Sequence, residues 1–377
     1  RHSFPTRRSS DLGDVLTPQG WIRGALQIED GRIMDVSGHS VSEAEVLADE
    51  RAKFIPGFID LHVHGTMGVD LMSEDESLAY IARHQIRYGT TAFLATTMTD
   101  TLDKVRSVLG SIRHYLEQPK QDDHAEVLGV HLEGPYISEN RLGAQPPQTR
   151  EAVLDEILTL HAIAPLKVIT LSPETMSDKT VITRLSELGI RVQIGHSSGT
   201  YEDGVEALEH GVSGFTHLFN GMTGLHHREP GIVGAALAHA EYAELIPDLL
   251  HVHPGAMRVA LRSIPHLYCV TDATAATGMP DGDYMLGSQP VRKCLGGVRV
   301  ANGSLAGSTL TMIEALRNLH SIGLSLADAS SRLSAVPAAY LGVSDRGVLA
   351  AGAIADVVEL APDLSLRATY VRGVRHE

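Results

Sequence analysis

The segment PGFIDLHVHG at residues 56–65 contains the pattern on which the fold assignment depends. An apolar run ends in His62 and His64, which stand two residues apart and therefore face the same side of an extended strand. Further apolar runs alternate with amphipathic stretches, which is typical of repeated strand–helix units. The eight expected strands cover residues 54–64, 90–98, 127–134, 166–174, 191–198, 214–221, 245–253 and 267–273. Eight such units predict an α/β fold built as a (β/α)8 TIM-type barrel.

Both ends of the chain have a different pattern. Residues 21–36 read as two short strands joined at Asp30-Gly31, a dipeptide that favours a tight hairpin turn. Similar β-like stretches close the chain. We therefore expect a small β-sandwich domain formed by both terminal segments, beside the barrel. The expected boundaries are residues 13–53 and 345–377 for the sandwich and 54–344 for the barrel.

The first twelve residues, RHSFPTRRSSDL, have no apolar core of the kind that a secretory signal requires. They resemble the translation of a sequencing-library adapter. We expect residues 1–12 to be a non-native segment and leave them out of the functional argument.

Composition limits the classes of function that are open to the chain. Its 377 residues carry a formal net charge of -15, which argues against general nucleic-acid binding because phosphates need a cationic surface. No stretch approaches the roughly 18 uninterrupted apolar residues of a membrane span. The two cysteines, Cys269 and Cys294, have no metal-binding spacing and provide no disulfide framework. We expect a cytoplasmic protein that binds neither nucleic acid nor membrane.

Polar residues recur near the carboxyl ends of the predicted strands, the face on which such barrels build their active sites. Imidazole and carboxylate groups suit Zn²⁺, Fe²⁺ or a related divalent ion. Taken alone, each residue could be structural: a core hydrogen-bonding histidine, a paired glutamate or a helix-capping aspartate. Their shared position favours a metal-dependent site instead. They are His62, His64, Glu133, His196, His217, His251 and Asp272.

The segment HHREPG at residues 226–231 places Arg228 in a loop after the sixth predicted strand. A guanidinium group there could bind a phosphate or a carboxylate through two parallel hydrogen bonds. It could equally be a solvated loop charge, and the residues alone leave both readings open.

Ten segments together resemble the N-acetylglucosamine-6-phosphate deacetylases, a family of the amidohydrolase superfamily, from about residue 20 to the C-terminus. These segments are PGFIDLHVHG, GTTAFLATTMT, GVHLEGPYIS, GAQP, THLFNGM, HHREPG, HVHP, VTDATAATG, LAGSTLTMIEALRNL and AAGAIADVV. The resemblance implies hydrolysis of N-acetylglucosamine 6-phosphate to glucosamine 6-phosphate and acetate. A metal-activated water would attack, with Asp272 as general acid and base.

The resemblance also implies roles for individual residues. Glu133, His196 and His217 would hold one divalent metal, and His62 and His64 would hold a second, so one or two ions are expected. Arg228 would bind the substrate phosphate of a neighbouring subunit, which makes a homodimer the expected assembly. The implied substrate contacts are Ala144, Gln145, Asn220, Gly221, His251, Leu305, Ala306 and Gly307.

Two features depart from the family pattern. Some relatives have histidine where Gln145 stands, and DLLH before His251 replaces a usual Asp-Gly pair. One alternative is an amidohydrolase that acts on a different N-acyl sugar, an N-acyl amino acid or a cyclic amide. Another is a catalytically silent sugar-phosphate sensor, which the full set of metal-ligating residues disfavours because a binding protein needs no activated water.

Overall fold

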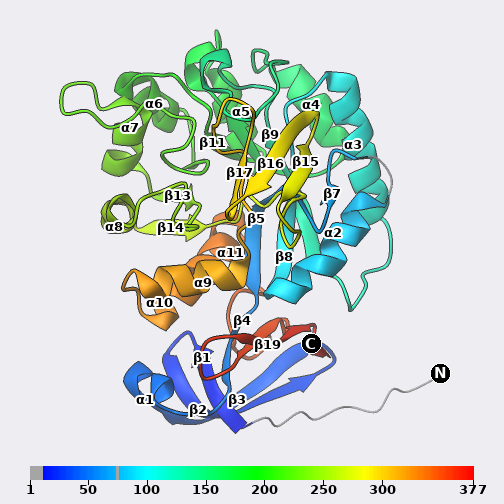
Figure 1. Ribbon diagram of the computed structural model, residues 1–377, viewed down its shortest axis with the longest axis vertical. Coiled ribbons are helices and arrows are strands. Elements are labelled where there is room, and N and C mark those ends of the chain that lie inside the picture. The colour runs from blue at the N-terminus through cyan, green and yellow to red at the C-terminus, as the bar shows by residue number, and fades with distance from the viewer. Residues whose placement is uncertain (1–11, 74–75) are drawn as a thin grey trace.

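The computed structural model describes residues 12–73 and 76–377 and shows a barrel joined to a smaller sheet from both ends of the chain (Figure 1). Six parallel strands form one sheet and two more form a parallel pair, which confirms the predicted fold class. The predicted non-native segment lies outside the described residues except for Leu12. The barrel strands are β5 (Phe58–Val63), β8 (Thr90–Thr97), β9 (Glu126–Glu133), β10 (Leu166–Leu171), β11 (Arg191–Ile194), β12 (Gly214–Phe215), β13 (Tyr242–Leu245) and β14 (His266–Cys269).

Backbone hydrogen bonds close the barrel between these two sheets. The amide of Leu218, just beyond β12, donates to the carbonyl of Glu244 in β13 at 2.9 Å. The amide of Asp272, just beyond β14, donates to the carbonyl of His62 in β5 at 3.0 Å. Every residue of β5 and β8 is buried, as expected for parallel strands that are covered on both faces. The closure fixes the strand ends that carry the polar residues.

The extent of two predicted strands was wrong at the upper rim of the barrel. The strand expected at 245–253 ends at Leu245, because Pro247 has no amide hydrogen for a ladder and Asp248 accepts hydrogen bonds from the amides of Leu250 and His251. The strand expected at 214–221 ends at Phe215, since the backbone turns into the left-handed region at His217, two residues later.

The first predicted strand, 54–64, is in fact two strands. β4 (Lys53–Pro56) belongs to the terminal sheet, and β5 belongs to the barrel. Gly57 separates them, and a Cβ atom at this position would collide with the side chain of Thr91. The chain passes between the two sheets at the one residue type that allows this close approach.

Helices surround the barrel and bury apolar residues against it. In α3 the buried residues Val105, Val108, Leu109 and Ile112 follow the spacing of one helix face. Among the described residues, no helix is long and apolar enough to cross a membrane. The helices are α2 (Ser77–Gln85), α3 (Leu102–Leu116), α4 (Leu154–Ile163), α5 (Thr180–Glu187), α6 (Tyr201–Glu209), α7 (Gly231–His239), α8 (Pro254–Ser263), α9 (Met312–Ser321), α10 (Leu326–Leu333) and α11 (Ala335–Leu341).

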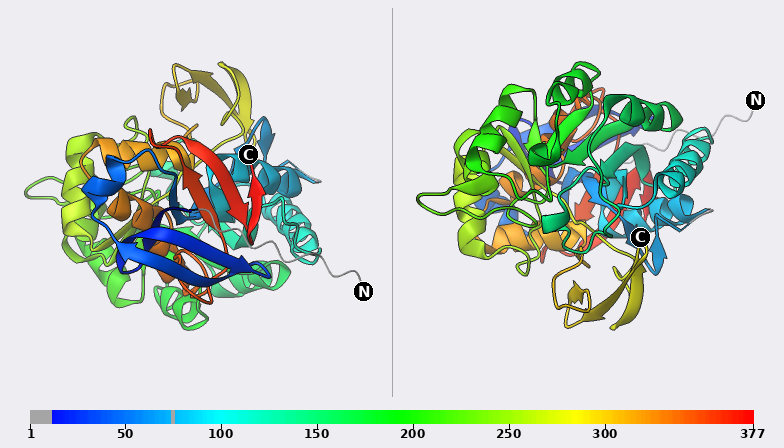
Figure 2. Two further views of the ribbon diagram at one scale, coloured as in Figure 1. Left: turned by 90° about the horizontal axis from the view of Figure 1, so that it is seen from below. Right: turned by 90° about the horizontal axis from the view of Figure 1, so that it is seen from above.

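Short elements complete the connections between strands and helices. They are α1 (Glu43–Leu47), the 3-10 turns η1 (Ile86–Tyr88), η2 (Glu139–Arg141) and η3 (Pro173–Thr175), and the small strand pair β6 (Gly65–Thr66) and β7 (Val69–Asp70). A three-stranded antiparallel sheet that the sequence did not predict follows β14, and it projects from the side of the barrel in Figure 2. Its strands are β15 (Gly282–Leu286), β16 (Gln289–Cys294) and β17 (Gly297–Arg299).

The terminal segments form one seven-stranded sheet in the order β20-β19-β18-β4-β1-β2-β3, so the predicted meeting of the two ends is confirmed. The predicted hairpin turn is also present, with φ of 50° at Asp30 and 76° at Gly31. Leu26 of β2 shares a separate apolar core with Tyr370 of β19, so distant strands of this sheet enclose one interior. The remaining bounds are β1 (Leu12–Thr17), β2 (Gly20–Glu29), β3 (Arg32–Ser40), β18 (Val357–Leu360), β19 (Leu366–Val371) and β20 (Val374–His376).

A buried arginine ties the terminal sheet to the bottom of the barrel. Arg346 donates to Glu126, at the start of β9, at 2.8 Å and to Asp356, just before β18, at 3.2 Å. Replacing Arg346 by alanine removes the buried cation between these carboxylates. Glu126 keeps its pair with Lys120, and Asp356 keeps the hydrogen bond from the amide of Arg372, so we expect a loss of about 3 kcal/mol in the free energy of unfolding, the lower end for a broken buried pair. Urea unfolding followed by circular dichroism measures this loss.

The matched control for this prediction is Arg32→Ala. Arg32 lies at the same junction, but its side chain is exposed and its ion pair with Asp345 is long, at 3.9 Å. We expect it to cost less than about 1 kcal/mol. Equal losses for the two variants would contradict the assignment of Arg346 as the buried link.

Candidate metal centre and catalytic site

Six of the predicted residues converge at the mouth of the barrel, where the carboxyl ends of the strands meet. They form two groups whose potential ligand atoms lie within 4.8 Å of one another inside each group. All six are buried, with at most 7% of their surface exposed. The first group is Glu133, His196 and His217, and the second is His62, His64 and Asp272.

The carboxylate of Glu133 lies between the two groups. Its Oε1 atom is 3.0 Å from Nε2 of His217 and 3.2 Å from Nε2 of His196. Its Oε2 atom is 3.2 Å from Nε2 of His64 and 3.4 Å from Nε2 of His62. One carboxylate oxygen therefore faces each pair of histidines.

The nitrogen atoms within each pair are so close that either a proton or a cation must lie between them. Nε2 of His196 is 3.1 Å from Nε2 of His217, and Nε2 of His62 is 3.1 Å from Nε2 of His64. Two ring nitrogens that face each other without a proton repel through their lone pairs. A cation at the centre of each group would be held by nitrogen and oxygen donors, the set that suits Zn²⁺ or Fe²⁺. The residues therefore fit a divalent metal.

Three histidine rings are held by oxygen atoms behind them. Nδ1 of His64 is 3.1 Å from the carbonyl of Thr96, and Nδ1 of His196 is 2.8 Å from the carbonyl of Arg141. Nδ1 of His62 is 3.0 Å from Oε2 of Glu244. A hydrogen on each Nδ1 leaves the Nε2 lone pair directed into the centre.

The charges of the centre keep its carboxylates ionised. Burial alone would raise the pKa of Glu133, but the charge of His62 and hydrogen bonds from His196 and His217 hold that pKa well below its ordinary value. The pKa of Asp272 is also lowered, against the effect of burial, by His62 and His64. Burial lowers the pKa of His64, but the carboxylates of Asp272 and Glu133 raise it to about 9. The site therefore favours positive charge at its middle.

Three of these residues have backbone angles that are uncommon for side chains with a Cβ atom. The φ angles are 48° at His196, 30° at His217 and 52° at Asp272. Such conformations cost free energy and are concentrated at functional sites. Here they follow directly after barrel strands and turn the side chains toward the centre.

A pocket of about 370 Å³ opens beside this centre. Seven of the eight predicted substrate contacts line it, whereas Ala306 is fully buried and is not among its lining residues. Arg228 lies on an exposed loop, with Nη1 2.8 Å from Nε2 of His227, and does not line the pocket either. The seven lining residues are Ala144, Gln145, Asn220, Gly221, His251, Leu305 and Gly307.

Two of these lining residues have fixed orientations. Oε1 of Gln145 accepts from the amide of Thr99 at 2.8 Å, so its Nε2 donates to Oε2 of Glu133 at 2.7 Å. Gln145 is thus bound to the central carboxylate. Nδ1 of His251 donates to Asp248 at 2.6 Å, and the same aspartate forms the DLLH turn in which the sequence departs from the family pattern.

Glu244 is a residue of the site that the sequence analysis missed. It lies in β13, one residue before the start of the strand that was predicted there, and it is fully buried against His62. The available signal was a glutamate inside the apolar run of residues 242–246, because a buried carboxylate needs a partner.

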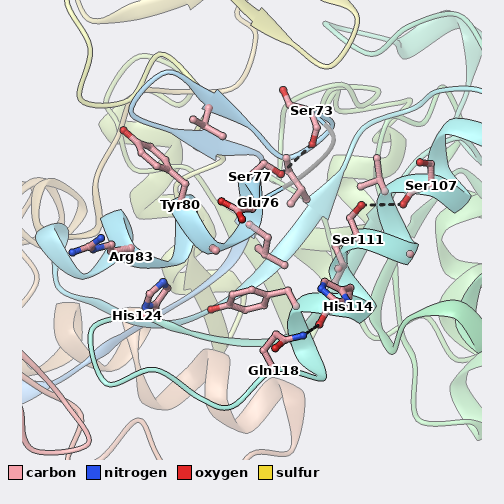
Figure 3. Close-up of a pocket in the computed structure, with 18 of the residues that line it drawn as sticks. Ser73, Glu76, Ser77, Tyr80, Arg83, Ser107, Ser111, His114, Gln118 and His124 are labelled. Atoms are coloured by element: carbon pink, nitrogen blue, oxygen red, sulfur yellow. Dashed lines mark hydrogen bonds between the residues drawn. The ribbon is translucent and has the colours of Figure 1, made fainter.

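A larger hollow of about 1490 Å³ lies elsewhere, on the outer faces of α2 and α3 (Figure 3). Tyr80 and Arg83 of α2 border it on one side, and Ser111 and His114 of α3 border it on the other. Within the described ranges, this hollow contains none of the side-chain groups that could hold a metal ion. Size alone therefore does not identify the chemical site.

Comparison with known proteins agrees with this geometry. A family model described as the amidohydrolase family matches residues 54–375. The N-acetylglucosamine-6-phosphate deacetylase of Vibrio furnissii is 40% identical over 99% of this chain and 94% of its own length. The N-acetylgalactosamine-6-phosphate deacetylase of Escherichia coli O157:H7 is 38% identical over 95% of this chain and 96% of its own length.

A solved structure is similar over the whole chain. It is a mutant N-acetyl-D-glucosamine-6-phosphate deacetylase from Mycobacterium smegmatis in complex with N-acetyl-D-glucosamine-6-phosphate. The TM-score is 0.88 at 29% identity, with 99% of each chain covered. The resemblance found in the sequence is confirmed, and the chain belongs to the amidohydrolase family, whose members depend on a metal.

Proposed function

We propose that this chain hydrolyses the acetamide of N-acetylglucosamine 6-phosphate and releases glucosamine 6-phosphate and acetate. The observation that carries the proposal is the position of Asp272, a buried carboxylate beside His62 and His64 at the pocket wall. The relatives named for this reaction support the choice of substrate.

In this proposal, the first metal position is bound by Glu133, His196 and His217, and the second is bound by His62 and His64. A divalent ion bound there would polarise the acetyl carbonyl and lower the pKa of water from 15.7 to about 7. Gln145 would hold the Glu133 carboxylate in place through its hydrogen bond to Oε2.

Asp272 would carry the proton. Its Oδ1 atom lies 3.2 Å from Nε2 of His64 and 3.4 Å from Nε2 of His62, so the carboxylate stays ionised and ready to accept. It would take a proton from the attacking water and deliver it to the amide nitrogen as the carbon–nitrogen bond breaks. Water thereby divides between the two products: its oxygen ends in acetate, one proton passes through Asp272 to the amine, and the other is released when the acetic acid ionises.

The phosphate needs a cation that this chain does not offer to its own pocket. Within the described residues, the pocket lining contains histidines but neither lysine nor arginine. We therefore propose that the protein is a homodimer in which Arg228 reaches the neighbouring subunit's pocket, while His251 binds the phosphate from its own side. The exposed position of Arg228 supports this arrangement.

Three further assignments belong to the proposal. They are a cytoplasmic location, a sandwich domain over residues 13–53 and 345–377, and a barrel domain over 54–344, with the boundary between the two moved to Gly57 because β4 belongs to the terminal sheet. A second candidate substrate is N-acetylgalactosamine 6-phosphate, because a relative named for its deacetylation is 38% identical.

Activity should require both a bound metal and the phosphate of the substrate. Protein stripped of metal and reloaded with Zn²⁺, Fe²⁺ or Mn²⁺ should release acetate from N-acetylglucosamine 6-phosphate only when a metal is present. Unphosphorylated N-acetylglucosamine should be hydrolysed far more slowly because the phosphate positions the sugar. Acetate release is measured enzymatically, with N-acetylgalactosamine 6-phosphate alongside. No turnover of either phosphate with any of these metals would overturn the proposed function.

The second prediction separates proton transfer from metal binding. Asp272→Asn should lower kcat by about 10²–10⁴-fold because the amide can neither accept nor return the proton. The first metal position should stay occupied, so atomic emission should still find at least one metal ion per chain. A variant with near-normal kcat would remove Asp272 from the mechanism.

The third prediction tests the shared pocket. Arg228→Ala and Asp272→Asn should each be nearly inactive alone. After subunit exchange at equal amounts, about half of the dimers are mixed and each carries one intact pocket, so activity should recover to about a quarter of the unaltered level. Mixing Asp272→Asn with His217→Ala is the control and should recover nothing, because both residues belong to one subunit's pocket. No recovery with Arg228→Ala would mean that this arginine does not act across subunits.

A further inference from the structure

A second polar assembly lies beneath the metal centre, and Glu244 is its main charged group. The residue lies in β13 and is completely buried. Oε2 of Glu244 accepts from Nδ1 of His62 at 3.0 Å and from the backbone amide of His217 at 3.3 Å. Its Oε1 atom accepts from the hydroxyl of Tyr268 at 3.1 Å. One carboxylate thus contacts a residue of each metal group from behind.

The contact with His62 decides which ring nitrogen faces the centre. A hydrogen on Nδ1 that is bound by Glu244 leaves Nε2 with a free lone pair. This Nε2 atom is the one that lies 3.1 Å from His64 and 3.4 Å from Asp272. Such a carboxylate behind a metal-binding histidine fixes both the tautomer and the ring orientation.

The contact with His217 acts through the backbone. His217 has a φ of 30°, and its Nδ1 atom is buried without a hydrogen-bond partner among the described residues. The ring is therefore not held from behind as the other three are. The hydrogen bond from its amide to Glu244 links the strained backbone to β13 instead.

Glu244 is itself held by a chain of buried side chains that runs around the barrel interior. This chain makes the position of the carboxylate rigid, because each member is fixed by its neighbours on other strands. The links are Tyr268–Gln193 (2.7 Å), Gln193–Thr216 (2.7 Å), Thr216–Thr170 (2.7 Å), Thr170–His131 (2.7 Å) and His131 to the carbonyl of Leu61 (3.0 Å).

This assembly is not a further metal site, although His62, His131 and Glu244 lie close enough to form one. Nδ1 of His131 is bonded to the carbonyl of Leu61, and Nε2 is bonded to Thr170. Nδ1 of His62 is bonded to Glu244 itself. Every nitrogen that could serve such a site already has a partner within the protein.

We propose that Glu244 is a positioning residue that directs Nε2 of His62 toward the second metal position and thereby sets the affinity of that position for its ion. The inference rests on the metal dependence within the proposed function, but it makes no use of the substrate. Glu244 touches neither the pocket nor the reacting atoms, since it is absent from the pocket lining.

The test is a metal titration of the stripped protein with Co²⁺, followed by absorption and by competition with a chelator. We expect the unaltered chain to bind two ions. Glu244→Leu, which is close in size but accepts no hydrogen bond, should weaken binding of the second ion by about 10–100-fold. Binding of the first ion should weaken by a smaller factor, because Glu244 reaches that position only through the backbone amide of His217, at 3.3 Å. Glu244→Gln keeps one acceptor oxygen, so its affinity for the second ion should lie between that of the unaltered chain and that of Glu244→Leu.

Tyr268→Phe is the matched control. It removes one hydrogen bond from Glu244 but leaves the contact with His62, so both ions should bind nearly as in the unaltered chain. If Glu244→Leu does not fold, as judged by circular dichroism, Glu244→Gln decides the question.

Three results would overturn the inference. They are unchanged affinities in the folded Glu244 variants, equal weakening of both ions, and an unaltered chain that binds only one ion. Because the readout is metal binding, a chain that binds metal as expected but does not hydrolyse the sugar would contradict the proposed function and leave this inference standing.

Discussion

The buried carboxylate of Glu133 is the constraint around which this site is organised. A carboxylate with 2% of its surface exposed has lost most of its hydration, and that loss must be offset by positive charge or hydrogen bonds. Four imidazole nitrogens and the Gln145 amide surround its two oxygens. None of the histidines can be brought there by local sequence, because they lie at the end of β5 and beyond β11 and β12, whereas Glu133 lies in β9. Compensation of the Glu133 charge therefore depends on the closure of the whole barrel.

Barrel closure and site geometry are parts of one arrangement. The amide of Asp272 donates to the carbonyl of His62, so the hydrogen bond that joins the last strand to the first also sets the candidate catalytic carboxylate beside a candidate ligand. The amide of Leu218 joins β12 to β13 in the same way, next to His217. Left-handed backbone at His217 and Asp272 then turns both side chains inward. The surrounding strands and hydrogen bonds hold conformations that an isolated loop would not keep.

The sequence was sufficient for the fold class and for the residues that gather at the strand ends, because both follow from periodic burial and from the geometry of parallel strands. It was less informative where tertiary contacts override a local pattern. The run 54–64 reads as one strand, yet Gly57 divides it between two sheets. Ala306 was inferred from a motif, and its side chain is fully buried and is not among the residues that line the pocket.

Glu244 shows why residues that support a metal ligand are harder to predict from sequence than the ligands themselves. A histidine at a strand end can be recognised as a candidate ligand from its position. The role of a glutamate within a strand cannot be inferred until its partner is known. That partner, His62, is 182 residues away in the chain. The same limit applies to Gln145, whose role as a donor to Glu133 depends on the amide of Thr99 fixing the orientation of its own amide.

Charge supports the proposal that a second subunit completes the pocket. The protein carries a formal net charge of -15, and the described lining of its pocket adds two carboxylates, Glu133 and Asp272, but no lysine or arginine. An anionic substrate would meet a repulsive field unless cations were supplied. Divalent ions would neutralise these carboxylates, which leaves the substrate phosphate without a lysine or arginine in the described lining. A cation from a second subunit would complete the pocket without placing a buried, unpaired arginine inside the isolated chain, where its desolvation would cost stability.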